Sequence, residues 1–255
     1  SLPFPARYLL PMEEYLSTKK GRTAWALSHP ATTVICSRGC PFHCSFCSSN
    51  LIFGRKVRFR SPENVVQELL DLKRTYGIRG VQFHDDTMTL NRSWLKRLCA
   101  LMVERKLNLE WFCNARVGTV DLRMLKEMEV AGCTTITFGV ESGSQRVLDQ
   151  VIKKGITLEA VQETFKVVRQ TNLILHATFM LGSPGEKKEE IEKIKEAEEY
   201  LEAALEALRI ARGEPDRRAR VLERASALRS GLRGLGLRVP EGSTPIIPVT
   251  GAPVR

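Results

Sequence analysis

Three cysteines lie close together at Cys40, Cys44 and Cys47, in the spacing CxxxCxxC. Three thiolates on one tight loop can bind three irons of a four-iron, four-sulfur (4Fe-4S) cluster, and the fourth iron then has no protein ligand. Such an open iron can bind a substrate directly. The spacing therefore indicates an iron–sulfur centre that leaves room for a substrate.

A zinc site is the alternative for these cysteines, with Cys36 or His43 as a fourth ligand. Structural zinc sites usually pair two separated groups of ligands around a tetrahedron, which favours the cluster here. Cys36 falls at the end of a predicted strand, so we expect it to pack near the cluster without ligating it. The remaining cysteines stand singly in apolar patterns typical of buried thiols: Cys99, Cys113 and Cys133.

The cysteine count also bears on the cellular compartment. The chain has 255 residues, of which 43% are hydrophobic and 27% are charged, as in ordinary globular proteins. Its seven cysteines are odd in number and four of them lie within residues 36–47, which favours metal in a reducing compartment over disulfides. Because there is no membrane-length apolar run and no signal sequence, we expect a cytoplasmic protein without a membrane span.

Short apolar, β-branched runs alternate with amphipathic segments, which predicts repeated βα units and a parallel sheet. The expected strands are residues 32–35, 80–83, 109–114, 134–140 and 173–181. Helix N-caps are expected at Ser61, Asn91, Asp121 and Thr157. Right-handed crossovers would curl these units into part of a barrel with the helices outside. The predicted fold is therefore α/β, an incomplete (βα)6 TIM-like partial barrel with five evident strands, followed by a helical C-terminal extension.

Polar residues follow each predicted strand. In order along the chain they are the cysteine triplet, Asp85 and Asp86, Arg116, Glu141, and the turn at residues 182–186. Active sites lie at the carboxyl ends of the strands in parallel α/β folds, so these segments indicate one shared site. For Arg116 two interpretations stay open: its guanidinium is suited to bind a carboxylate with two hydrogen bonds, but it could also form a surface ion pair.

The formal charge of +10 falls in residues 1–195, which hold 29 Lys and Arg against 20 Asp and Glu. The densest basic patch lies at residues 55–60, which could meet phosphates but is more often typical of a solvated edge segment. We expect no nucleic-acid partner, because the chain lacks an element that reads bases.

The composition changes near residues 190–200. The last 60 residues contain ten Arg and no Lys. We predict a long helix at residues 187–212, a second at 215–233, and a short edge strand at Ile246 and Ile247. The expected organisation is a lead-in at 1–29, a partial barrel at 30–195, and a helical, Arg-rich tail at 196–255.

Residues 36–47, 83–87 and 138–144 together resemble the radical S-adenosylmethionine (SAM) superfamily. Residues 2–12 and 54–64 are similar to members that carry a cobalamin-binding domain upstream. The DxHxxG segment of that domain is not in this chain, so no cobalamin chemistry is expected of the chain alone. The resemblance extends to about residue 195.

The resemblance implies a 4Fe-4S cluster on Cys40, Cys44 and Cys47, with SAM chelating the open iron. An electron from the cluster would cleave SAM to methionine and a 5′-deoxyadenosyl radical, which abstracts hydrogen from a small-molecule or unknown substrate. It also implies an external electron donor of flavodoxin or ferredoxin type. The implied SAM contacts are Phe46 and residues Gly182 to Glu186 for adenine, Asp85 and Asp86 for the methionyl amine, and Glu141 with Ser142 for the ribose or amine.

The tail resembles a different family. Residues 203–208, 228–237 and 244–249 are similar to the C-terminal domain of α-oxoamine synthases, which suggests a chimeric chain. Pyridoxal-phosphate activity is not expected, because the tail has no lysine for a Schiff base. A missing sixth strand would leave the fifth as an exposed edge open to self-association. The alternative functions are therefore a truncated, inactive radical SAM domain and an interaction module, with or without metal.

Overall fold

The computed structural model describes residues 3–16 and 28–191, together with the single positions Glu223, Ser226, Ala227, Ser230 and Arg233. The chain divides into two compact units, Ser1–Leu201 and Glu202–Arg255. A helical turn at residues 188–191 begins where the long helix was predicted. The rest of that helix, the Ile246–Ile247 strand and nearly all of the helix predicted at 215–233 lie outside the described residues.

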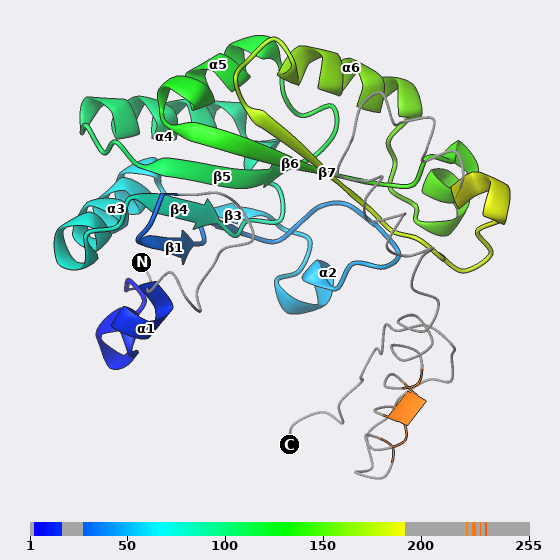
Figure 1. Ribbon diagram of the computed structural model, residues 1–255, viewed down its shortest axis with the longest axis horizontal. Helices are drawn as coiled ribbons and strands as arrows, with labels where there is room; N and C mark the ends of the chain where they lie inside the picture. The colour runs from blue at the N-terminus through cyan, green and yellow to red at the C-terminus, as the bar shows by residue number, and fades with distance from the viewer. Residues whose placement is uncertain are drawn as a thin grey trace. The chain divides into compact units, whose positions relative to one another are not determined.

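A five-stranded parallel sheet forms the centre of the first unit, and its strands follow one another in chain order (Figure 1). The strands are β1 (Ala31–Val34), β4 (Gly80–Phe83), β5 (Glu110–Ala115), β6 (Cys133–Glu141) and β7 (Ile174–Phe179). Each is parallel to the next. This order confirms the predicted α/β fold, an incomplete TIM-like barrel in which successive strands are neighbours.

Four helices connect the strands, and α4, α5 and α6 cover one side of the sheet (Figure 1). They are α3 (Pro62–Tyr76), α4 (Arg92–Glu104), α5 (Leu122–Val130) and α6 (Leu158–Val168). All four predicted N-caps are confirmed, because each side chain accepts a hydrogen bond from the backbone N–H three residues on. None of the helices in the described part of the chain is long and apolar enough to cross a membrane.

Short elements complete the first unit. They are η1 (Arg7–Leu9), α1 (Met12–Leu16), α2 (Ser49–Ile52), η2 (Met88–Leu90), the π-helical turn η3 (Val147–Val151), and the antiparallel pair β2 (Ser37–Arg38) and β3 (Arg58–Phe59). The lead-in that contains η1 is held by Arg7, which donates to the carbonyl of Thr33 in β1 at 3.0 Å.

Large aromatic side chains fill the space around the sheet. Phe83 and Trp111 meet edge to face with ring centroids 5.4 Å apart, and Phe138 lies 6.1 Å from Phe165 of α6. All four are essentially inaccessible to solvent. Burial of a large side chain of this kind contributes about 1.5–3 kcal/mol, so these contacts fix the positions of the strand ends.

β7 is the last strand of the sheet, and among the described residues no strand pairs with its outer edge. It is shorter than the predicted segment at 173–181, and Ile174 is 51% exposed. The predicted edge is thus present in the described part of the chain.

Candidate functional site

A cavity of about 240 Å³ lies at the carboxyl ends of the strands. The predicted site residues that line it are Cys40, Cys44, Cys47, Phe46, Asp86, Arg116 and Glu141. They come from the segments after β1, β4 and β5 and from the last residue of β6, as expected for a parallel sheet whose strand ends meet at one edge. The predicted residues that do not line it are Asp85, Ser142, Gly182 and Glu186.

Hydrogen bonds hold the loop that carries the cysteines at two points, Cys40 and Ser45. The Cys40 N–H donates to the Gly54 carbonyl at 3.2 Å. At the other end Ser45 donates to Ile152 through its backbone N–H and to Val151 through its hydroxyl, at 2.8 and 2.7 Å. The loop is therefore held against the residue range just after α2 and against the end of η3, and its three thiols line the cavity.

The basic segment at residues 55–60 contacts this loop, and three of its cations are exposed, as expected for a solvated edge segment: Arg55, Lys56 and Arg58. Arg55 donates to the Phe42 carbonyl at 3.2 Å, and the Arg60 N–H donates to the Cys36 carbonyl at 2.8 Å. β3 within this segment pairs with β2, which leads into the cysteines. At Gly39, where φ is +97°, an added Cβ would clash with the Lys56 carbonyl. The close approach of these two segments of the chain therefore requires glycine.

The environment of the Cys40 thiol changes its acidity. Burial raises the pKa of the Cys40 thiol, and the nearby Asp86, Cys47 and Cys44 add to the rise. Among the described residues, however, no three His, Cys, Asp or Glu side chains gather around a single point.

The other two candidate ligands, Cys36 and His43, do not line the cavity. Cys36 is fully buried outside the cavity, and burial raises its pKa well above the usual value. His43 is exposed and does not line the cavity. The expectation that Cys36 packs near the cluster without ligating it stays a prediction.

Asp85 lies behind the cysteine loop, whereas the resemblance placed it beside SAM. Its carboxylate is 1% exposed and accepts hydrogen bonds from the backbone N–H groups of Cys36 and Ser37 and from the Ser37 hydroxyl. Burial raises the Asp85 pKa, and these hydrogen bonds partly offset the rise. The neighbouring Asp86 lines the cavity instead and accepts a hydrogen bond from the Ser49 hydroxyl at 2.5 Å.

Glu141 forms a buried ion pair with Lys154, whose ammonium lies 2.9 Å from the carboxylate. The register of β6 and β7 shifts between Gly139 and Glu141, and Glu141 itself has φ of +75°. For a residue with a side chain this conformation costs on the order of 1–3 kcal/mol, and such strain is typical of functional sites. A Cβ at Gly139 would overlap Glu141 Oε1 and lie 2.7 Å from Lys154 Nζ, so a larger residue there would displace one or both side-chain ends.

Arg116 is buried at 8% exposure, which removes the surface ion pair as an interpretation. Its guanidinium lies 3.6 Å from the centroid of the Phe42 ring. Nη2 donates to the carbonyls of Lys154 and Gly155. The other N–H donors of this guanidinium have no partner among the described residues and remain for a ligand in the cavity.

The remaining predicted residues hold the turn after β7. Glu186 accepts hydrogen bonds from the backbone N–H groups of Gly182 and Ser183 at 2.7 and 3.0 Å. The Ser142 hydroxyl donates to Glu186 at 3.4 Å, and Ser142 is fully buried. Ser142, Gly182 and Glu186 therefore connect the end of β6 to the turn after β7. They are close in sequence to residues that line the cavity but do not line it themselves.

Lys154 was not among the predicted site residues. Its ammonium lies 5.7 Å from the Phe46 ring centroid and bonds Glu141, so it connects the cysteine loop to the end of β6. A signal for it was available: Lys153 and Lys154 precede Gly155 in the connection after the fourth strand, where the other site residues also follow strands.

Alkylation of the cluster-free native chain at neutral pH should modify Cys47 and spare Cys99. Cys47 is exposed, whereas Cys99 is buried and burial raises its pKa to about 12, so it holds almost no thiolate. We expect the Cys99 rate to be at least about tenfold lower, measured by mass spectrometry after iodoacetamide treatment. Equal rates at the two positions would show that α4 separates readily from the sheet.

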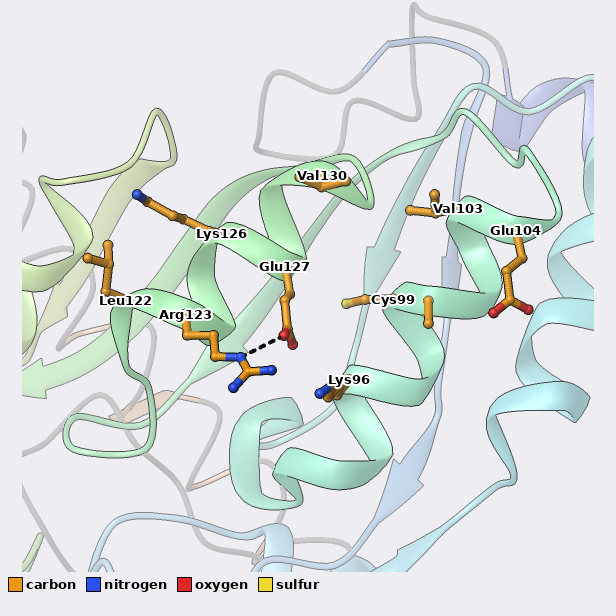
Figure 2. A pocket seen from close by; sticks show the side chains of 10 residues that line it. Lys96, Cys99, Val103, Glu104, Leu122, Arg123, Lys126, Glu127 and Val130 are labelled. Atoms are coloured by element: carbon orange, nitrogen blue, oxygen red, sulfur yellow. Dashed lines mark hydrogen bonds and ion pairs between the residues drawn. The ribbon is translucent and has the colours of Figure 1, made fainter.

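A larger cavity of about 880 Å³ lies between α4 and α5 (Figure 2). Val103 and Val130 border it, together with the stems of charged side chains such as Lys96 and Lys126. Arg123 and Glu127 on its wall pair with each other at 3.2 Å. This groove therefore offers mostly apolar surface and no converging polar groups.

The chain is similar to known proteins over most of its length. The model of the Radical SAM superfamily matches residues 34–197. An uncharacterized methyltransferase of Pyrococcus horikoshii is 37% identical over 191 residues, which are 75% of this chain and 39% of that protein. The cytidylyl-2-hydroxyethylphosphonate methyltransferase of Streptomyces wedmorensis is 32% identical over 208 residues, 80% of this chain and 39% of that protein. The chain thus spans about two fifths of the length of these relatives.

Among solved structures, the radical S-adenosylmethionine methyltransferase TsrM from Kitasatospora setae shares the fold. Its TM-score is 0.61 at 22% identity, over 68% of this chain and 34% of that one. None of these matches supports the resemblance of residues 200–255 to α-oxoamine synthases, which stays a prediction.

Proposed function

The chain belongs to the radical SAM superfamily, and from this premise we propose that it binds a 4Fe-4S cluster and SAM and cleaves SAM reductively. Cys40, Cys44 and Cys47 would hold the cluster, which leaves an iron open to SAM. The observation that carries the proposal is that these thiols line the same cavity as Asp86, Arg116 and Glu141.

The cluster, when bound, would supply the electron that breaks a carbon–sulfur bond of the SAM sulfonium. The role of the chain is to bind and orient SAM. The cavity offers cations at Arg116 and Lys154 and carboxylates at Asp86 and Glu141. This mixture suits a ligand with an ammonium, a carboxylate and ribose hydroxyls, because charge-assisted hydrogen bonds form to each.

The Glu141–Lys154 pair would also prepare the site before SAM arrives. Each partner holds the other in place by a direct contact, and removal of either would leave a buried group without its partner, which is costly. A ligand carboxylate could bind Lys154, and a ligand ammonium or hydroxyl could bind Glu141. The ion pair would stay intact in both cases, so neither side chain would become an unpaired buried charge. Donors and acceptors fixed in advance cost no reorganisation when the ligand binds.

An external electron donor and a small-molecule substrate complete the proposal. We also propose a cytoplasmic location, because an oxidising compartment would convert the cluster thiols to disulfides. Self-association through β7 belongs to the same proposal, because its outer backbone groups lack strand partners in the described part of the chain.

The test is anaerobic cleavage of SAM by the iron-loaded chain with dithionite as reductant. We expect 5′-deoxyadenosine and methionine as products. Glu141→Gln should weaken SAM binding by roughly 1.5–3 kcal/mol, the value of a charged hydrogen bond, or about ten- to a hundredfold in Kd. Calorimetry measures this loss, with Glu127→Gln on α5 as the control that keeps wild-type affinity.

The outcomes separate the three hypotheses. A chain that binds iron and sulfide but yields no 5′-deoxyadenosine would be the truncated, inactive domain. A chain that takes up no iron or sulfide would be an interaction module. Unchanged SAM affinity in Glu141→Gln together with a lower melting temperature would assign Glu141 to the fold alone.

A further inference from the structure

The surface beside the cysteine loop is both basic and apolar. In α2, Leu51 is 83% exposed and Ile52 is 69% exposed. The next residues supply three exposed cations, Arg55, Lys56 and Arg58. These five residues form what we name the α2 surface. Arg58 reaches back to the carbonyl of Phe53 at 3.0 Å, which keeps the cations close to the end of α2.

The positive charge of the α2 surface is not neutralised within the described residues. No Asp or Glu occurs between Glu14 and Glu63 in the sequence. Arg55 and Arg58 donate only to backbone carbonyls, and the Lys56 side chain has no hydrogen bond or ion pair among the described residues. This surface therefore attracts an acidic partner.

The same surface borders the thiols. Cys47 is exposed and lies only two residues before α2, so a cluster there would be near the protein exterior at this point. An exposed aliphatic pair surrounded by cations is suited to a protein interface with an apolar centre and a charged rim. The two exposed apolar residues are aliphatic, which disfavours single-stranded nucleic acid, because bases stack on aromatic side chains.

We propose that the α2 surface docks an acidic electron-donor protein whose redox centre lies near its own surface. The inference rests on the proposed function, which requires one electron at the cluster for each SAM cleaved. With a flavin donor, the anionic hydroquinone is oxidised to the neutral semiquinone and the oxidised cluster gains one electron. No atom passes between the two proteins.

A pair of matched double variants tests the docking. Leu51→Gln with Lys56→Glu alters the α2 surface, and Val130→Gln with Lys126→Glu makes the same kinds of change on α5 (Figure 2). Figure 1 shows α2 and α5 on opposite sides of the sheet. All four side chains are exposed and make no hydrogen bond or ion pair among the described residues. Neither double variant should therefore disturb the fold.

The probe is an acidic flavodoxin, and the first readout is its affinity for the cluster-free chain by calorimetry at low salt. The second readout is the rate of cluster reduction by flavodoxin hydroquinone compared with dithionite. The α2 variant should lose about tenfold or more in both affinity and flavodoxin rate, because charge steering contributes 10- to 1000-fold to association. Its rate with dithionite should equal the wild-type rate, and the α5 variant should match wild type throughout.

Equal flavodoxin affinity for wild type and the α2 variant would overturn the proposal. So would equal losses in the two double variants, or loss of single-stranded RNA binding with flavodoxin binding intact. A tenfold loss of flavodoxin affinity in a chain that fails to cleave SAM would support the docking surface and reject the proposed function.

Discussion

Replacement of Cys44 by alanine should abolish cluster binding, whereas Cys36→Ala should leave the cluster in place. Cys44 lines the cavity with Cys40 and Cys47, and a cluster held by two thiolates loses a third of its protein ligands. Cys36 is buried and does not line the cavity, so we expect that its thiol does not bind an iron of the cluster. Anaerobic iron and sulfide analysis after reconstitution measures the difference, and we expect at least a tenfold drop in iron content for Cys44→Ala.

The Cys36→Ala variant also controls for damage to the loop. Cys36 accepts the hydrogen bond from Arg60 and donates one to Asp85 through its backbone, and alanine preserves both. An empty site in Cys36→Ala with a full one in Cys47→Ala would contradict the assignment of the ligands.

The strands could be predicted from the sequence to within one or two residues at most ends. Their β-branched runs are short, and N-cap residues such as Ser61 and Asn91 mark where the following helices begin. Local chemistry determines both features, so no long-range information was needed. The strand order follows from the chain order for the same reason, since right-handed crossovers bring successive strands together.

The choice between neighbouring side chains could not be predicted. Asp85 and Asp86 follow the same strand, and the sequence does not say which of the two carboxylates lines the cavity. The structure assigns Asp86 to the cavity and Asp85 to the backbone of the cysteine loop. Lys154 was missed because its contact with Glu141 joins the end of β6 to the connection that follows it, which the residue types alone do not reveal.

For the basic segment at residues 55–60, composition alone could not predict which groups the arginines contact. Arg55 is exposed and Arg60 is half-buried, and each donates to a backbone carbonyl: Arg55 to Phe42 in the cysteine loop and Arg60 to Ile35 just after β1. A clue lay elsewhere, in α3, where Glu68 falls on the buried face with Val65, Leu69 and Leu72. A lone carboxylate on an apolar stripe requires a cationic partner from another segment, because a buried unpaired charge is costly.

Glu68 in fact binds two arginines from two segments. Its Oε1 lies 2.5 Å from Arg7 of the lead-in, and its Oε2 lies 2.6 Å from Arg60. Arg60 also donates to the Ile35 carbonyl at 3.0 Å, directly before the cysteine loop. One carboxylate therefore connects the lead-in, α3 and the entrance to the thiols.

Glu68→Gln should destabilise the cluster-free chain by about 3 kcal/mol, the lower end for a buried ion pair that loses one partner, since both arginines keep some solvent contact. Urea unfolding followed by circular dichroism measures the loss. Glu63→Gln on the same helix is the matched control, because Glu63 and its partner Arg97 are both more than half exposed, and its midpoint should equal that of wild type. Because Arg60 also holds the backbone at Ile35 and Cys36, Glu68→Gln should take up less iron than Glu63→Gln in urea too dilute to unfold either chain. Equal unfolding midpoints for the two variants would show that the arginines reach solvent when Glu68 is neutral, and that this carboxylate does not hold the cysteine loop in place.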